Sequence, residues 1–216
     1  MKKNKQFAVL GLGRFGQSVV KTLSKYGYDV LCCDKNPELV TQMTPYATEA
    51  MQADISDEGA LKEMGLSNYD IVIIATGDSL ESAVMATMTA KEMKVETVIS
   101  KAKDLKQANI LYKVGADKVV MPERDMGMRL ATSLITSNVL DYISFSDDYG
   151  VAEIAPMSKW VGKTLAGANI RAATGLTVVA IKREKKVIAS PNPQETINPE
   201  DILVVIGTNE QIQQCN

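Results

Sequence analysis

The spacing of glycines near the start of the chain points to phosphate chemistry. The short apolar run Phe7–Leu10 is followed by Gly11-Leu12-Gly13-Arg14-Phe15-Gly16, and a helical pattern then continues to Tyr26. In a strand–turn–helix, the first glycine permits the tight turn, the second lets a phosphate approach the backbone, and the third lets the helix pack closely on the strand. The N–H groups and partial positive charge of the helix N-terminus then face the anion. We interpret the motif as a nucleotide-binding loop rather than as ordinary turn glycines.

Asp34 stands where such a site needs a ribose ligand. It ends a second apolar run, at about the 20-residue distance from the glycines expected for a carboxylate that accepts from ribose hydroxyls. Its charge disfavours a 2′-phosphate, and therefore NADP. The alternative is a solvated turn acid. Lys35, the next residue, could cover the adenosine, although solvated lysines are common.

Further candidates follow from charge and position. Arg14 can reach a terminal phosphate through two hydrogen bonds, and an exposed arginine at a helix N-terminus would otherwise oppose the helix dipole. The loop Ala75-Thr76-Gly77 can line the phosphates, whereas its alternative is a helix N-cap by Asp78 or Ser79. Glu123 stands at the start of a later helix. From the sequence alone, the leading interpretation is that its carboxylate accepts from the free N–H groups at the helix N-terminus.

Composition excludes several classes of protein. The 216 residues are 45% hydrophobic, which supports a folded core, and the net charge of −2 disfavours nucleic-acid binding. The absence of histidine removes the commonest general base and the commonest zinc ligand. Three cysteines, two of them adjacent, make no disulfide framework and suit a reducing cytoplasm. The basic start is not interpreted as a signal peptide, and apolar runs of strand length predict no direct membrane insertion.

Short apolar runs alternate with helical patterns through the first two thirds of the chain. We expect strands at 6–10, 28–33, 47–52, 70–75, 96–100 and 117–121, with helices near 14–26, 36–44, 57–64, 79–93 and 104–113. This alternation predicts an α/β fold, with a Rossmann-type parallel sheet covered on both faces. A helical pattern at 123–139 has apolar positions on more than one face, so it packs against its own domain and a partner, or it is a fully buried internal helix.

The remaining pattern predicts a second, smaller domain. We expect residues 1–140 to form the nucleotide-binding domain with a crossover helix at about 123–139. Residues 141–150, which include the polar stretch Phe145–Gly150, are expected to form a linker. Residues 151–216 then form a small α+β domain with strands near 151–155, 177–183, 186–190 and 202–207. A domain of this size has little room for an enzymatic cleft of its own.

Several motifs together resemble one family over essentially the full chain. They are Gly11–Gly16, Gly115-Ala116-Asp117, Pro122–Gly127, Asn138–Tyr142 and Asn198–Leu203. The chain resembles the KtrA/KtrC regulatory subunits of bacterial Ktr potassium uptake systems, which join an N-terminal RCK (KTN) domain to a small C-terminal RCK domain. The resemblance implies a cytosolic protein that forms an octameric ring of dimers and gates a KtrB/KtrD-like membrane subunit, peripheral to the inner face of the membrane. It also implies that ATP or ADP binds in the N-domain and, in many members, cyclic di-AMP in the C-domain.

The resemblance also implies roles for individual residues. Arg14 is implied to reach toward the nucleotide of a neighbouring subunit and to distinguish ATP from ADP. Lys101 is implied to lie near the phosphates, and Glu123 to help hold Mg²⁺ or Ca²⁺ at the terminal phosphate. The implied adenine contacts are Ala53, Asp54 and Ile55. The implied cyclic di-AMP groove comprises Ile170, Arg171, Ala172 and Pro191, although this chain departs from the family pattern at Ala173-Thr174.

Two functions compete for the nucleotide-binding loop. The first is a non-catalytic sensor, in which exchange of ATP for ADP repositions subunits. The second is a small NAD-dependent oxidoreductase, with NAD(H) as the weaker ligand prediction. The missing histidine, the lack of an evident Tyr-x-x-x-Lys pair and the small second domain favour the sensor. A DNA-binding redox regulator is excluded by the charge.

Overall fold

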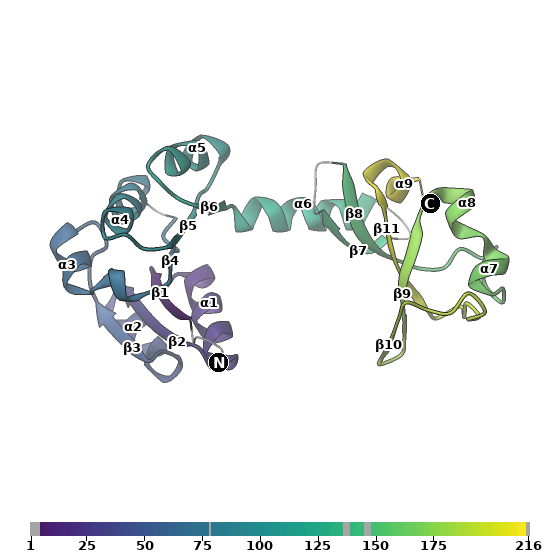
Figure 1. The fold of residues 1–216 in the computed structure, drawn as a ribbon, viewed down its shortest axis with the longest axis horizontal. Helices are drawn as coiled ribbons and strands as arrows, with labels where there is room; N and C mark the ends of the chain where they lie inside the picture. Colours follow the sequence, from purple (N-terminus) through teal and green to yellow (C-terminus); the bar gives the residue numbers. More distant parts are fainter. Residues whose placement is uncertain (1–4, 78, 136–138, 145–147, 215–216) are drawn as a thin grey trace. The chain divides into compact units, whose positions relative to one another are not determined.

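The computed structural model describes residues 5–77, 79–135, 139–144 and 148–214 (Figure 1). The chain divides into two compact units, Met1–Arg124 and Asp125–Asn216. No helix within the described ranges is long and apolar enough to cross a membrane.

Unit 1 contains a parallel six-stranded sheet in the order β3-β2-β1-β4-β5-β6. This is the doubly wound order of a Rossmann-type domain, as predicted. Its strands are β1 (Gln6–Leu10), β2 (Asp29–Asp34), β3 (Glu49–Gln52), β4 (Ile71–Ile74), β5 (Thr97–Lys101) and β6 (Lys118–Val120). Its helices are α1 (Arg14–Lys25), α2 (Pro37–Met43), α3 (Glu58–Glu63), α4 (Leu80–Glu92) and α5 (Leu105–Lys113), with 3-10 turns at Thr44–Tyr46 and Leu66–Asn68.

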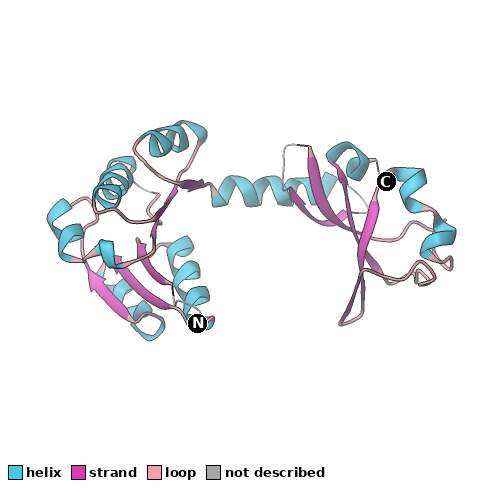
Figure 2. Ribbon diagram, viewed as in Figure 1, coloured by secondary structure: helices cyan, strands magenta, loops and turns pink. Residues whose placement is uncertain are grey.

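Apolar side chains cover both faces of this sheet. Successive residues of a strand point to opposite faces, so Cys32 packs in the cluster that contains Val20 of α1 and Met43 of α2. Cys33 packs in the other cluster, which contains Leu61 of α3 and residues of α4 and α5. Figure 2 shows helices on both sides of the strands. Burial on two faces explains why the strands read as continuous apolar runs.

Unit 2 is built on a five-stranded antiparallel sheet in the order β10-β9-β11-β8-β7. Its core contains Trp160, Ile154, Ile181 and Leu203, all buried. The strands are β7 (Val139–Ser144), β8 (Tyr149–Ile154), β9 (Thr177–Arg183), β10 (Lys186–Ala189) and β11 (Ile202–Thr208). The helices are α7 (Leu165–Ala168), α8 (Ile170–Thr174) and α9 (Asn209–Gln213), while α6 (Pro122–Ile135) spans the division between the units.

Two predictions about the middle of the chain are wrong. The helix was predicted to reach about 139, whereas α6 is described as far as Ile135 and Val139 already belongs to β7. Strand β7 (Val139–Ser144) also includes part of the predicted 141–150 linker. Pairing with β8 buries Val139 in the unit 2 core, and this outweighs the helical pattern. Gly150 is a strand residue too: a Cβ there would lie 2.5 Å from a ring carbon of Tyr142, so the glycine makes room for the ring. Residues 145–147 lie outside the described residues.

The fully buried alternative for α6 is also wrong. Met126, Met128 and Leu134 are between 57% and 75% exposed in the single chain. The helix therefore presents apolar side chains that one copy of the chain leaves uncovered.

Candidate functional site

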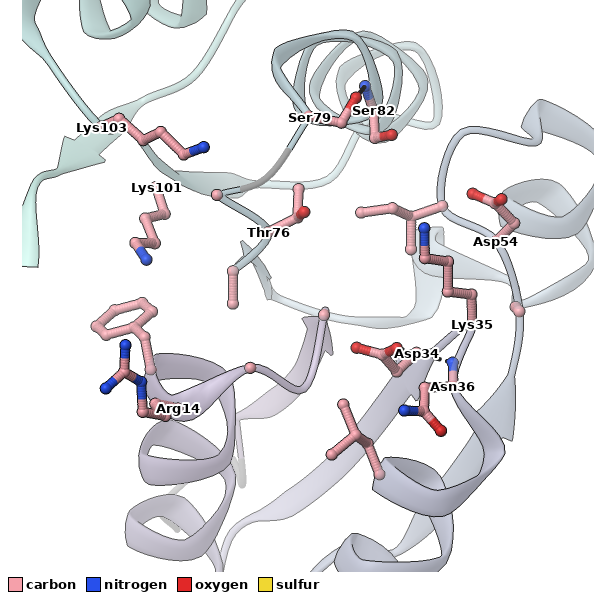
Figure 3. A pocket seen from close by; sticks show the side chains of 18 of the residues that line it. Arg14, Asp34, Lys35, Asn36, Asp54, Thr76, Ser79, Ser82, Lys101 and Lys103 are labelled. Carbon is pink, nitrogen blue, oxygen red and sulfur yellow. Dashed lines mark hydrogen bonds between the residues drawn. The ribbon is translucent and has the colours of Figure 1, made fainter.

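A hollow of about 650 Å³ at the carboxyl edge of the parallel sheet collects most of the predicted site residues (Figure 3). It lies where β1 and β4 are neighbours and the strand order reverses, the position where doubly wound sheets bind ligands. The predicted residues that line it are Gly11, Gly13, Arg14, Phe15, Asp34, Lys35, Ala53, Asp54, Ile55, Ala75, Thr76, Gly77, Lys101 and Glu123.

Gly11 fixes the turn at the end of β1. Its φ of +101° belongs to the region that glycine alone adopts readily, and a Cβ there would lie 3.0 Å from the backbone nitrogen of Thr76. The Gly11 N–H donates to the Cys33 carbonyl oxygen at 2.8 Å. The turn is thus held between the end of β2 and the loop after β4.

The N-terminus of α1 differs from its neighbours in how it is capped. The side chains of Asn36, Asp57, Ser79 and Asp104 cap α2, α3, α4 and α5, respectively. The N-cap residue of α1 is Gly13, which offers no capping side chain, and the first turn of the helix carries Arg14 and no acid. The first-turn N–H groups and the arginine are therefore available to an anion in the hollow.

Two predicted residues, Leu12 and Gly16, lie outside the lining. Leu12 is fully buried in the core on the α1 side of the sheet. A Cβ on Gly16 would lie 2.0 Å from the carbonyl oxygen of Gly11 and 3.2 Å from the Cβ of Ala75. These two residues hold the helix close to the turn and do not face the hollow.

Asp34 is anchored by two backbone groups. Its Oδ2 accepts from the Leu12 N–H at 2.7 Å, and its Oδ1 accepts from the Asn36 N–H at 2.9 Å. The carboxylate therefore joins the glycine loop to the start of α2 while lining the hollow. Each carboxylate oxygen has a second lone pair, so the group retains acceptor capacity for a hydroxyl.

Lys101 and Glu123 form an ion pair at the end of the hollow away from Asp34. The Lys101 Nζ donates to Glu123 Oε1 at 2.6 Å, and the side chains are 13% and 68% exposed, respectively. The ammonium group holds the pKa of Glu123 below its usual range, and the charge of Arg14 adds a smaller effect in the same direction. At Asp54, hydrogen bonds from the backbone and hydroxyl of Ser56 lower the pKa.

Most of the charged side chains are divided between the two ends of the hollow, although Glu123 lies with the cations, paired with Lys101. Figure 3 shows Arg14, Lys101 and Lys103 on one side, whereas Asp34 and Asp54 lie on the other, with Lys35 between them. An elongated ligand with anionic groups at one end and hydroxyl or amine donors at the other matches this distribution.

The described residues of one chain do not form a complete metal site by themselves. Within the described ranges, no group of three His, Cys, Asp or Glu side chains could hold one. Glu123 is instead held by an ammonium group.

Comparison with known proteins identifies the family. The TrkA-N domain model matches residues 7–122, and the TrkA-C domain model matches residues 151–215. The chain is 43% identical over 204 residues to Ktr system potassium uptake protein C of Bacillus subtilis (strain 168), covering 94% of this chain and 92% of that protein. This chain belongs to the KtrA/KtrC family of RCK regulatory subunits. It is also 39% identical over 211 residues to Ktr system potassium uptake protein A of the same organism, covering 98% and 95% of the two chains.

Solved structures agree on the fold of this KtrA/KtrC-type chain. The crystal structure of the GsuK RCK domain matches with a TM-score of 0.67 at 16% identity, covering 98% of this chain and 46% of that chain. The GsuK channel bound to NAD matches with a TM-score of 0.66 at the same identity, covering 98% of this chain and 38% of that chain. At this identity the likeness shows the fold alone.

A second hollow, of about 250 Å³, lies in unit 2. Its lining includes three of the four residues predicted for the cyclic di-AMP groove, namely Ile170, Arg171 and Pro191. Ala172, which was predicted with them, is exposed on α8 and lies outside the lining. The other lining residues are Leu165, Ala166, Asn169, Leu176, Thr177, Val178 and Pro193.

Sequence reasoning missed five residues of the first hollow, namely Asn36, Leu39, Ser79, Ser82 and Lys103. Asn36 and Ser79 had a readable signal as helix N-caps that follow β2 and β4. Lys103 follows β5 at the same sheet edge, so strand topology could have placed it. Leu39 and Ser82 lie in the first turns of α2 and α4, and the sequence pattern of the family motifs does not mark them.

Proposed function

We propose that this chain is a non-catalytic, nucleotide-sensing regulatory subunit of a potassium channel or transporter, with ATP and ADP as alternative ligands of the first hollow. The observation that carries the proposal is the charge distribution of that hollow. Three of its cations, Arg14, Lys101 and Lys103, suit a phosphate chain, and two of its carboxylates, Asp34 and Asp54, suit ribose and adenine donors.

In this assignment the ligand lies across the turn after β1. Gly11 and Gly13 approach the phosphates, Asp34 accepts from the ribose hydroxyls, and Ala53, Asp54 and Ile55 surround the adenine. Arg14 contacts the γ-phosphate, which only ATP carries, of the nucleotide in a neighbouring subunit. A ligand shifts a conformational equilibrium only by the difference in its affinity for the two states, and this contact supplies a difference between ATP and ADP.

The chemistry of the hollow supports a sensor over an oxidoreductase. The chain contains no histidine. Hydrogen bonds lower the pKa of Asp54, and the ammonium of Lys101 lowers that of Glu123, so both carboxylates are weaker bases than ordinary ones. A general base works best with a pKa near the working pH. The family assignment to regulatory subunits fits the same conclusion.

The proposal extends to partners and to a second ligand. A homo-octameric ring of dimers would cover the exposed apolar residues of α6, such as Met126 and Leu134. The ring would act on a KtrB/KtrD-like membrane subunit from the cytoplasmic side. The hollow of unit 2, in which Arg171 supplies a cation beside apolar residues and prolines, would receive the phosphodiesters and purines of cyclic di-AMP.

Isothermal titration with ATP, ADP, NADH and NADPH tests the nucleotide assignment. We expect ATP and ADP to bind with similar affinity and more tightly than either nicotinamide nucleotide. Asp34→Asn should weaken both by about 10- to 100-fold, because a charge-assisted hydrogen bond contributes about 1.5–3 kcal/mol.

Asp70→Asn is the matched control. Asp70 accepts from the Gln6 N–H at 2.9 Å at the amino end of β1, so it anchors the opposite edge of the same sheet. This variant should retain wild-type affinity. Tighter binding of NADH than of ATP, or equal effects of the two variants, would contradict the assignment.

A further inference from the structure

One wall of the unit 2 hollow is an irregular segment. Pro191 and Pro193 line the hollow from the connection between β10 and β11, where Pro191–Ile197 has no extended helix or strand. The backbone bonds of this segment run mainly to residues 162–166, which carry the opposite wall, rather than within a regular element of its own. Its conformation therefore depends on what its neighbours provide.

Arg183, at the end of β9, binds this segment through hydrogen bonds from its guanidinium group. Its Nη1 donates to Glu195 Oε1 at 2.8 Å, and its Nη2 donates to the Thr196 carbonyl oxygen at 2.8 Å. The same group pairs with Asp201, through Nε to Oδ1 at 2.8 Å and Nη2 to Oδ2 at 2.9 Å. One planar side chain thus joins β9, the irregular segment and the residue that precedes β11.

Asp201 fixes the position of the Arg183 guanidinium group. Its side chain is 0% exposed, and its Oδ2 also accepts from the Asn198 N–H at 2.8 Å. Asp201 belongs to the Asn198-Pro199-Glu200-Asp201 motif, which has no role in either proposed ligand site. Pairing with Arg183 lowers the pKa of this carboxyl, so it stays ionised and keeps its partner.

The other side of the segment holds the opposite wall of the hollow. The Leu165 N–H donates to the Glu195 carbonyl oxygen at 2.9 Å, and the Ala166 N–H donates to the Pro193 carbonyl oxygen at 2.9 Å. Leu165 and Ala166 begin α7 and line the hollow themselves. A shift of the segment therefore moves two walls at once.

We propose that Arg183 is a positioning residue for the unit 2 hollow, holding the proline wall and the α7 wall at the separation that a ligand needs. The role rests on the proposed ligand of that hollow, cyclic di-AMP. Arg183 does not line the hollow itself, so it acts on the ligand only through these walls. Holding a site in its bound shape raises affinity because less order is lost on binding.

The test uses Arg183→Lys in the full chain. Lysine keeps a positive charge beside Asp201 but cannot also reach Glu195 and the Thr196 carbonyl oxygen. We expect the dissociation constant for cyclic di-AMP to rise about tenfold, as the loss of one or two hydrogen bonds allows. The dissociation constant for ATP should not change. Hydrogen–deuterium exchange by mass spectrometry should show faster exchange in the peptide covering residues 162–168.

Lys182→Met is the matched control. Lys182 is the neighbouring residue of β9 and pairs with Glu153 of β8, away from the irregular segment. This variant should retain cyclic di-AMP affinity and slow exchange at residues 162–168. If the Arg183→Lys variant does not fold in unit 2, the Glu195→Gln variant is used in its place. That change weakens the interaction between Arg183 and the irregular segment and leaves the pair of Arg183 with Asp201 intact.

The outcomes separate the two proposals. Failure of the wild-type chain to bind cyclic di-AMP would overturn the ligand assignment, whereas the exchange measurement would still report on Arg183. Unchanged affinity together with unchanged exchange in the Arg183→Lys or Glu195→Gln variant would overturn the positioning role. Equal losses in the Lys182→Met control would do so as well, because the effect would then be general destabilisation.

Discussion

Gly13→Ala is the substitution that best separates an effect on nucleotide binding from an effect on the stability of the fold. The φ of −63° and ψ of 179° at Gly13 are open to any residue, and an added Cβ would meet no atom within 4 Å. Gly13→Ala should therefore lower the free energy of unfolding by less than about 1 kcal/mol, the scale of a changed N-cap. The same methyl group would occupy the space through which a phosphate reaches the N–H groups of α1.

The expected loss of affinity follows from those N–H groups. A hydrogen bond to a charged group contributes about 1.5–3 kcal/mol, so displacing one phosphate contact should raise the dissociation constant for ATP by about 10- to 100-fold. The melting temperature should stay within about 4 °C of wild type, the shift expected from 1 kcal/mol in a chain of this size. Isothermal titration and thermal unfolding on the same preparation measure both quantities.

Gly16→Ala is the contrasting variant. A Cβ at Gly16 would lie 2.0 Å from the Gly11 carbonyl oxygen, so α1 or the turn must move. Overpacking of this kind costs about 1–3 kcal/mol, so affinity and melting temperature should fall together. If Gly13→Ala bound ATP as tightly as wild type, the phosphates would not contact this turn and the site assignment would be refuted.

Three further predictions test other groups. Arg14→Ala should bring the effects of ATP and ADP on the shape of the assembly closer together in scattering measurements; an unchanged difference would show that Arg14 does not sense the γ-phosphate. Glu123→Gln should tighten ATP binding several-fold in the absence of divalent ions, because it frees the charge of Lys101; weaker binding would contradict this. Pairing with Arg183 lowers the pKa of Asp201 in the folded state. The ionised carboxylate therefore stabilises the fold fully above about pH 4, the ordinary pKa of an aspartate, and this stabilisation is lost as the pH falls through the lowered pKa of the folded state. Urea unfolding followed by the fluorescence of the single tryptophan, Trp160 in unit 2, should show this loss in wild type and a flatter pH dependence in Asp201→Asn; equal slopes would contradict it.

The sheet of unit 1 was predictable because it is covered on both faces. Buried parallel strands such as Ile71–Ile74 read as continuous apolar runs, and the glycine motif fixes which loop carries the site. The placement of Lys101 and Glu123 in the hollow came from resemblance, because nothing local in the sequence brings them together. Their ion pair depends on the meeting of β5 with the start of α6.

Other features depend on contacts that sequence patterns do not encode. Strand β7 was missed because Leu140 and Ile143 remain exposed in the chain, which weakens the alternation that marks a half-buried strand. Gly150 suggested a linker, although it serves to admit the ring of Tyr142. The pairing of Arg183 with Asp201 joins two strands across an irregular segment, so no periodic pattern predicts it.

The central claim is that the hollow behind Gly11 and Gly13 senses how many phosphates its nucleotide carries. Small-angle X-ray scattering of the purified assembly, saturated with ATP or with ADP, tests it most directly. The account predicts two distinct scattering curves for wild type and a smaller difference between them for Arg14→Ala. Identical curves for the two nucleotides, with saturation established by titration, would contradict the account.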